Sequence, residues 1–179
     1  MRWLTFIVCA VIGIILQTTL ADRLTVFHVK PDWMFVLTVF FALYSSRRNA
    51  VLAGWLLGVL VDLTSVERLG VMSAGFALTA VLVNAVRHQV FLKNSVTHFM
   101  VTVCAGLVLH TALVAYHVVV YAPGSGRWGA VVLERGAQVL YTGVWAIPVH
   151  HCLLKCTRWM WLDTSSYGHA GLAPIDVRH

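Results

Sequence analysis

The stretch from Ala53 to Gly70 reads Ala-Gly-Trp-Leu-Leu-Gly-Val-Leu-Val-Asp-Leu-Thr-Ser-Val-Glu-Arg-Leu-Gly. Gly54, Gly58 and Asp62 recur at every fourth residue, so on an α-helix they share one narrow stripe. Two glycines in such a stripe let a neighbouring helix approach closely, which is how helices associate in lipid. Asp62 ends the apolar run, where a carboxylate needs water or a partner. The stretch therefore predicts a helix-packing seam that ends in a functional carboxylate.

The composition indicates an integral membrane protein of one domain. Of the 179 residues, 59% are hydrophobic and 11% are charged, whereas a typical soluble domain has about 25% charged residues. The net charge of +6 lies in short loops between apolar runs, so it indicates topology rather than nucleic-acid binding. Four cysteines lie within or beside apolar runs and are expected to behave as small apolar residues rather than disulfides: Cys9, Cys104, Cys152 and Cys156.

Six apolar runs predict an all-α bundle of six transmembrane helices. The spans cover about 3–21, 32–46, 49–63, 69–86, 96–121 and 136–154. Residues 1–162 would form the membrane domain, and the polar tail 163–179 is expected to be disordered. The first run could also be a signal peptide. Its apolar core is longer than a usual signal core and almost no basic region precedes it, so we expect a retained anchor.

The second run is the weakest of the six. Pro31 suits a helix start because its missing N–H would be unpaired there, and Asp32 favours the positive end of the helix dipole. Trp33–Tyr44 is short and is closed by the arginine pair at 47–48, so bilayer thinning or snorkelling is expected. If this run pairs with the third as a re-entrant hairpin, the number of spans falls to four.

The charges predict that both termini lie on the cytoplasmic side. With six spans, eight basic and two acidic residues fall on the inner side, which gives it a net charge of +6. Five basic and five acidic residues fall on the outer side, so that side is neutral. An excess of Lys and Arg belongs on the cytoplasmic side.

Residues 124–129 spell G-x-G-x-x-G. A dinucleotide site needs a strand before this motif and a phosphate-facing helix after it. Here the preceding segment is an apolar helix, so we interpret the motif as a turn. H-E-x-x-H, G-x-S-x-G and P-loop patterns are absent. We therefore expect no enzymatic activity and no cofactor.

Histidines and cysteines of the last two runs suggest two further sites, neither of which we favour. A haem held between helices is conceivable because His110 and His117 share a face, but no second pair lies at a matching depth in the sixth run. We interpret the histidines as interfacial or inter-helix hydrogen-bonding groups. A zinc ion needs four converging ligands, whereas the histidines of the following cluster point away from its cysteines: His150, His151, Cys152 and Cys156.

Asp62 is the best single candidate for function, with two interpretations left open. It could be a hydrated carboxylate at the outer interface or one paired with Arg68, because interfacial depth lowers the cost of burial. Alternatively it could contact a partner or clasp a neighbouring helix. Arg87 is most simply a cytoplasmic anchor of the fourth span.

The ordered motifs resemble the MreD family of bacterial rod shape-determining membrane proteins. Pro31-Asp32 opens the second span, an arginine pair closes it, and Gly54-x-x-x-Gly58-x-x-x-Asp62-Leu63 follows. Leu69-Gly70 then opens the fourth span, and Arg87 ends it. The motifs cover residues 31–87, and the whole chain agrees in length and number of spans.

The resemblance implies a six-helix inner-membrane protein without catalytic activity. MreD-like proteins join MreC and the actin-like MreB, together with a SEDS glycosyltransferase and a class B penicillin-binding protein. Their fold looks similar to the S-components of energy-coupling-factor vitamin transporters, so a transport subunit remains the alternative. Polar groups converging near Asp62, Asn84 and His110 would favour transport, whereas a bundle filled with Leu, Val and Phe would favour a scaffold.

Overall fold

The computed structural model describes residues 3–19, 23–25, 29–65, 68–87, 95–121 and 128–160, and these form six α-helices and no strand. The helices are α1 (Trp3–Thr19), α2 (Trp33–Tyr44), α3 (Arg47–Thr64), α4 (Val71–Val86), α5 (Ser95–Tyr121) and α6 (Trp128–Met160). An all-helical fold with six helices is therefore confirmed for the described residues. The predicted disorder of the tail 163–179 lies outside them.

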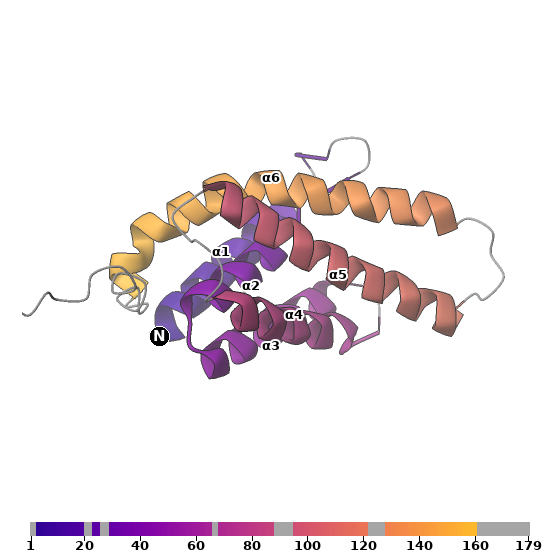
Figure 1. Ribbon diagram of the computed structural model, residues 1–179. Coiled ribbons are helices and arrows are strands. Elements are labelled where there is room, and N and C mark those ends of the chain that lie inside the picture. Colours follow the sequence, from indigo (N-terminus) through magenta and orange to yellow (C-terminus); the bar gives the residue numbers. More distant parts are fainter. Residues whose placement is uncertain are drawn as a thin grey trace, which may run out of the picture.

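Helix α2 forms the centre of the bundle. All 12 of its residues are buried, and it contacts each of the other five helices. Figure 1 shows α1 to α4 packed together, with the longer α5 and α6 running along one side of them. At 1.5 Å per residue α2 is about 18 Å long, well short of the roughly 30 Å hydrocarbon core. The expected thinning or snorkelling is unnecessary, because protein rather than lipid surrounds this helix.

Aromatic and aliphatic side chains fill the interior around α2. Phe40 and Phe41 are almost fully buried, as is Phe76 of α4. Phe41 makes an edge contact with Phe6 of α1, with ring centroids 5.1 Å apart. Phe35 and Phe76 meet similarly at 5.8 Å. Edge-to-face pairs of this kind add packing energy beyond the area they bury.

The outside of the bundle is strongly apolar. Leu4 of α1, Val119 of α5 and Leu133 of α6 are each about three-quarters exposed or more, and further large apolar side chains are exposed on α3 and α4. Such an outer surface is unfavourable in water but suits contact with lipid. By length and composition, one helix of the described residues meets the criterion for a membrane span, Val96–Val120, while α1, α2 and α4 are apolar but shorter.

Three element boundaries differ from the sequence prediction. Arg47 and Arg48 form the first turn of α3 rather than closing the second run, because only Ser45 and Ser46 separate α2 from α3. Helix α6 begins at Trp128, so the predicted turn at 124–129 overlaps its first residues, and the rest of that turn lies outside the described residues. The helix also continues past Pro148 to Met160. The sequence prediction started this helix near residue 136, because the glycines at 124–129 indicated a turn.

We predict that Gly58→Ala destabilises the protein, whereas Gly136→Ala does not. A Cβ at Gly58 would lie 2.7 Å from the Met72 carbonyl oxygen of α4, but a Cβ at Gly136 would meet no atom within 4 Å. Overpacking costs about 1–3 kcal/mol, which exceeds the roughly 1 kcal/mol that alanine gains over glycine in a helix. Thermal unfolding midpoints in one detergent measure the difference. A Gly58→Ala protein as stable as the parent would contradict the close contact.

Candidate functional site

The two glycines of α3 lie directly against α4. A Cβ at Gly54 would come within 2.8 Å of the Phe76 carbonyl oxygen and 3.0 Å of the Ala80 Cβ. A Cβ at Gly58 would likewise collide with backbone atoms, which belong to Met72 and Ser73. We call Gly54 and Gly58 with the facing part of α4 the glycine seam. The neighbour of this seam is a helix of the same chain, so these glycines are unavailable to a partner protein.

Asp62 closes the seam at the N-terminus of α4. Its side chain is 2% exposed. Oδ2 accepts hydrogen bonds from the backbone N–H groups of Gly70 and Ser73, both at 3.0 Å, and Oδ1 accepts one from Met72 at 3.1 Å. These are N–H groups that the first turn of a helix leaves without partners, and the helix dipole favours a negative charge there. Asp62, a residue of α3, therefore fixes the start of α4 by hydrogen bonds.

This geometry favours the clasp of a neighbouring helix over a simply hydrated carboxylate at Asp62. A simply hydrated carboxylate is inconsistent with its burial, whereas a clasp between neighbouring helices describes its three backbone contacts. Gly70 allows the chain to turn between them, because its φ of 104° lies in the left-handed region that glycine adopts without strain. The Gly-x-x-x-Gly-x-x-x-Asp spacing and Leu69-Gly70 thus belong to one α3–α4 unit.

Asp32 caps the N-terminus of α2. Its Oδ1 accepts a hydrogen bond from the Phe35 N–H at 2.9 Å, and its own N–H donates to Thr142 Oγ1 of α6 at 3.1 Å. The Trp33 N–H donates to Gln17 Oε1 of α1 at 2.9 Å. The helix begins at Trp33, so Pro31 precedes the capping residue instead of occupying the first helical position. Pro31-Asp32 therefore starts α2 and joins that start to α1 and α6.

The C-terminus of α2 is bound from α4. Asn84 Nδ2 donates to the carbonyl oxygens of Ala42 at 2.8 Å and Ser45 at 3.2 Å. Arg87 Nη1 also donates to the Ser45 carbonyl. The sequence suggests Arg87 both as a cytoplasmic anchor and as a member of a helix-packing or partner interface, and in the structure it contacts the end of α2, a neighbour that the sequence does not specify. Sequence reasoning assigned Asn84 no structural role, because a single amide in an apolar run does not indicate which backbone groups it binds.

A buried histidine pair joins α5 to α6. The rings of His98 and His150 stack with centroids 4.7 Å apart, and both residues are almost fully buried. Tyr44 of α2 lies 3.4 Å from His98 through its hydroxyl, and His150 Nδ1 lies 2.8 Å from the Ala146 carbonyl oxygen. This stack joins one histidine from each helix and does not involve His110 or His117, the pair considered for a haem. The predicted inter-helix hydrogen bond is made by His98 with Tyr44, whereas His150 bonds within α6 and meets α5 through ring stacking.

The residues proposed to line a substrate cavity do not converge. Asp62 of α3 contacts the start of α4, whereas Asn84 lies near the end of α4. His110 lies between α5 and α6, where it lines a separate recess of about 170 Å³ with Arg135. Within the described segments, no three His, Cys, Asp or Glu side chains come together to hold a metal ion. The proposed cluster at residues 150–156 includes Cys156, whose side chain lies outside the described set.

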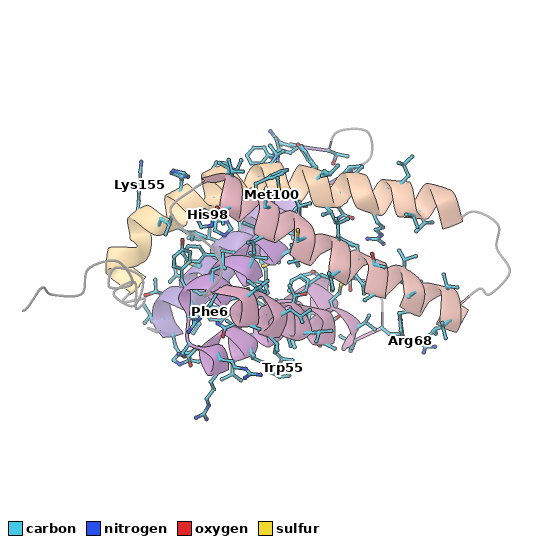
Figure 2. All side chains as sticks on the ribbon, viewed as in Figure 1. Phe6, Trp55, Arg68, His98, Met100 and Lys155 are labelled. Atoms are coloured by element: carbon cyan, nitrogen blue, oxygen red, sulfur yellow. The ribbon has the colours of Figure 1, made fainter. Side chains whose placement is uncertain are left out.

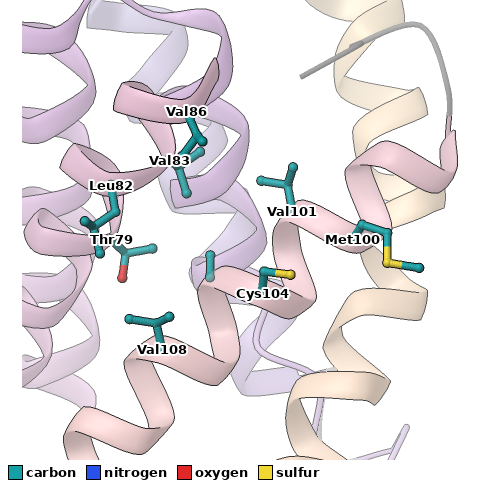
Figure 3. A pocket seen from close by; sticks show the side chains of 9 residues that line it. Thr79, Leu82, Val83, Val86, Met100, Val101, Cys104 and Val108 are labelled. Atoms are coloured by element: carbon teal, nitrogen blue, oxygen red, sulfur yellow. The ribbon is translucent and has the colours of Figure 1, made fainter. Parts of the chain in front are cut away.

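The outer faces of the bundle carry two apolar grooves. One, of about 290 Å³, lies between α4 and α5, where Leu82 and Val86 face Val101 and Val108 (Figure 3). The second, of about 460 Å³, lies among α1, α2 and α6, and we call it the α1–α6 groove. A further recess, of about 410 Å³, is more polar and adjoins Asp32 and Gln17 near the N-terminus of α2.

Together these features define a helical membrane bundle whose buried polar groups cap and fasten helices. The chain belongs to the MreD family, because the family described as rod shape-determining protein MreD matches residues 1–158. Its members are membrane proteins of cell-shape determination. No curated protein and no solved structure matches the chain.

We predict that Asp62→Asn destabilises the protein more than Asp32→Asn does. Asparagine has one acceptor oxygen, so at position 62 its NH₂ group would face an N–H that the carboxylate now binds, at a cost of about 1–3 kcal/mol. At position 32 the Oδ1 atom accepts from the Phe35 N–H in the usual capping geometry, and asparagine caps helices as well as aspartate does. Thermal unfolding of both variants in one detergent tests this order. Equal shifts of the two midpoints would contradict the Asp62 clasp.

Proposed function

We propose that this protein is a non-catalytic scaffold subunit of the bacterial cell-elongation complex. It would act with MreC and MreB, and through them with a SEDS glycosyltransferase and a class B penicillin-binding protein, to organise peptidoglycan synthesis. Membership of the MreD family is the observation that carries this proposal. The inner membrane would be its location, with no nucleic acid among its partners.

The packed interior supports a scaffold rather than a transport subunit. Phenylalanine, leucine and valine fill the space around α2, including Phe40, Leu57 and Val39. Buried polar side chains bind backbone groups at helix ends, as Asp62 and Asn84 do. A small-molecule site needs an enclosed cavity with a few converging polar groups. These polar side chains are instead committed to the fold.

The arrangement of the basic residues supports six crossings with both termini inside. Arg47 and Arg48 begin α3, Arg87 ends α4, and Lys155 lies near the end of α6. Because successive helices alternate in direction, these positions belong to one end of the bundle. In Figure 2, Lys155 lies near one end and Arg68 near the other. Basic residues collected at one end suit the cytoplasmic leaflet, whose lipids are anionic.

Partner contacts in this proposal use surfaces other than the glycine seam. The seam is filled by α4, and Asp62 is buried against the first turn of that helix. Exposed apolar side chains remain on α1, α3, α5 and α6, for example Ile7, Trp55 and Leu140. In lipid, helices associate by close packing of such faces. Substitutions in the seam would therefore impair assembly indirectly, by destabilising the subunit.

A substrate-binding subunit of a vitamin-like transporter is the second candidate function. The polar recess beside Asp32 is the observation that favours it, since Gln17, Lys30 and Thr64 also line this recess. Its position near the N-terminus of α2 would face outward in the proposed topology. The fold likeness to S-components of energy-coupling-factor transporters belongs to the same proposal.

Affinity purification of the tagged protein from its own membranes tests the two functions. The scaffold predicts co-purification of MreC and other elongation proteins, identified by mass spectrometry. A tagged multi-pass protein of unrelated function, expressed at equal level and solubilised identically, is the control. Recovery of an ATPase pair with a coupling subunit, or of a bound small molecule, would instead favour transport and overturn the scaffold.

A further inference from the structure

The α1–α6 groove combines an apolar trough with one cation. Val8 and Ile12 of α1 form one wall, Cys152 and Leu153 of α6 the other, and Leu37 of α2 lies between them. Val8, Ile12 and Cys152 are exposed, so the groove opens to the surroundings of the bundle. Of the described residues that line it, Lys155 alone carries a charge. The groove is therefore amphiphilic, with a single polar end.

The length of the groove matches one leaflet of a bilayer. Its lining residues on α1 extend from Thr5 to Leu16, which is about 17 Å at 1.5 Å per residue. Half of a roughly 30 Å hydrocarbon core is about 15 Å. Lys155, near the C-terminal end of α6, lies toward the start of α1, because the start of α1 and the end of α6 lie at the same end of the bundle (Figure 1). The charge thus lies where a lipid headgroup would.

The shape and charge of the groove suit a lipid chain. The groove holds about 460 Å³ among α1, α2 and α6, and its lining is apolar apart from the end at Lys155 and Thr5. A thin hydrocarbon chain can follow the trough from end to end, with its charged headgroup at the cation.

We propose that the α1–α6 groove binds an acyl chain of an anionic phospholipid whose phosphate contacts Lys155. Each buried CH₂ group favours binding through the hydrophobic effect, and the ammonium group attracts the anionic headgroup. The groove between α4 and α5 is apolar as well, but its described lining residues include no charged side chain to fix a headgroup. Only the assignment to the cytoplasmic leaflet rests on the proposed function and its topology.

Photolabelling of the purified protein in lipid nanodiscs tests the site. A phosphatidylglycerol probe with a diazirine on its acyl chain is irradiated, and labelled peptides are identified by mass spectrometry. We expect enriched labelling of α1 and α6 at the groove, and weaker labelling by a phosphatidylcholine probe of equal chain length. Lys155→Gln should reduce groove labelling by the anionic probe roughly fivefold. Arg48→Gln, which removes an exposed cation at the same end away from the groove, should leave it unchanged.

A second pair of variants separates loss of the groove from loss of the fold. Val8 lines the groove and Val11 does not, although the two side chains are similarly exposed, at 48% and 52%. Val8→Trp should fill the groove and lower labelling, while Val11→Trp should not; both should keep the parent unfolding temperature. Labelling that is even around the bundle, or that survives both Lys155→Gln and Val8→Trp, would overturn the proposal. Because the assay uses the protein alone, its result is independent of whether elongation partners co-purify.

Discussion

The burial of α2 with both of its ends satisfied is the constraint on which the rest of the structure depends. In an apolar surrounding, an unsatisfied backbone group costs several kcal/mol, and a helix leaves four such groups at each end. Here Asp32 and Gln17 accept from the first turn, while Asn84 and Arg87 donate to carbonyls at the other end. These side chains come from the preceding loop, α1 and α4. A helix shorter than the hydrocarbon core is thereby accommodated within the protein.

The contact between α3 and α4 fixes the position of α4 relative to α2. Glycine at 54 and 58 allows the two backbones to touch, and Asp62 binds the first N–H groups of α4. Fixing α4 at its start also fixes Asn84 and Arg87, which lie three to four turns later on the same helix. The glycine seam therefore also positions the two side chains that bind the C-terminus of α2. The residues that the sequence suggests for a partner contact instead hold two helices of the same chain together.

The sequence predicted the helices well because lipid imposes long apolar runs with charged ends. It also identified Gly54, Gly58 and Asp62 as members of one face, since a four-residue spacing fixes that geometry. It could not say which helix lay opposite, because that depends on tertiary packing. The central position of α2 was missed for a related reason: a short apolar run looks like a poor span until the capping partners are known. The His98–His150 stack joins residues far apart in sequence, so no local pattern indicated it.

Hydrogen–deuterium exchange of the protein in lipid nanodiscs tests the central position of α2 most directly. Peptides covering Trp33–Tyr44 should exchange more slowly than those of any other described helix, and protection should include the first-turn amides of Trp33 and Phe35 that Gln17 and Asp32 bind. The peripheral α1 serves as the internal comparison, because much of its surface is exposed. Exchange of α2 as fast as that of a solvated re-entrant loop, or fast exchange confined to those first-turn amides, would contradict a buried, doubly capped central helix.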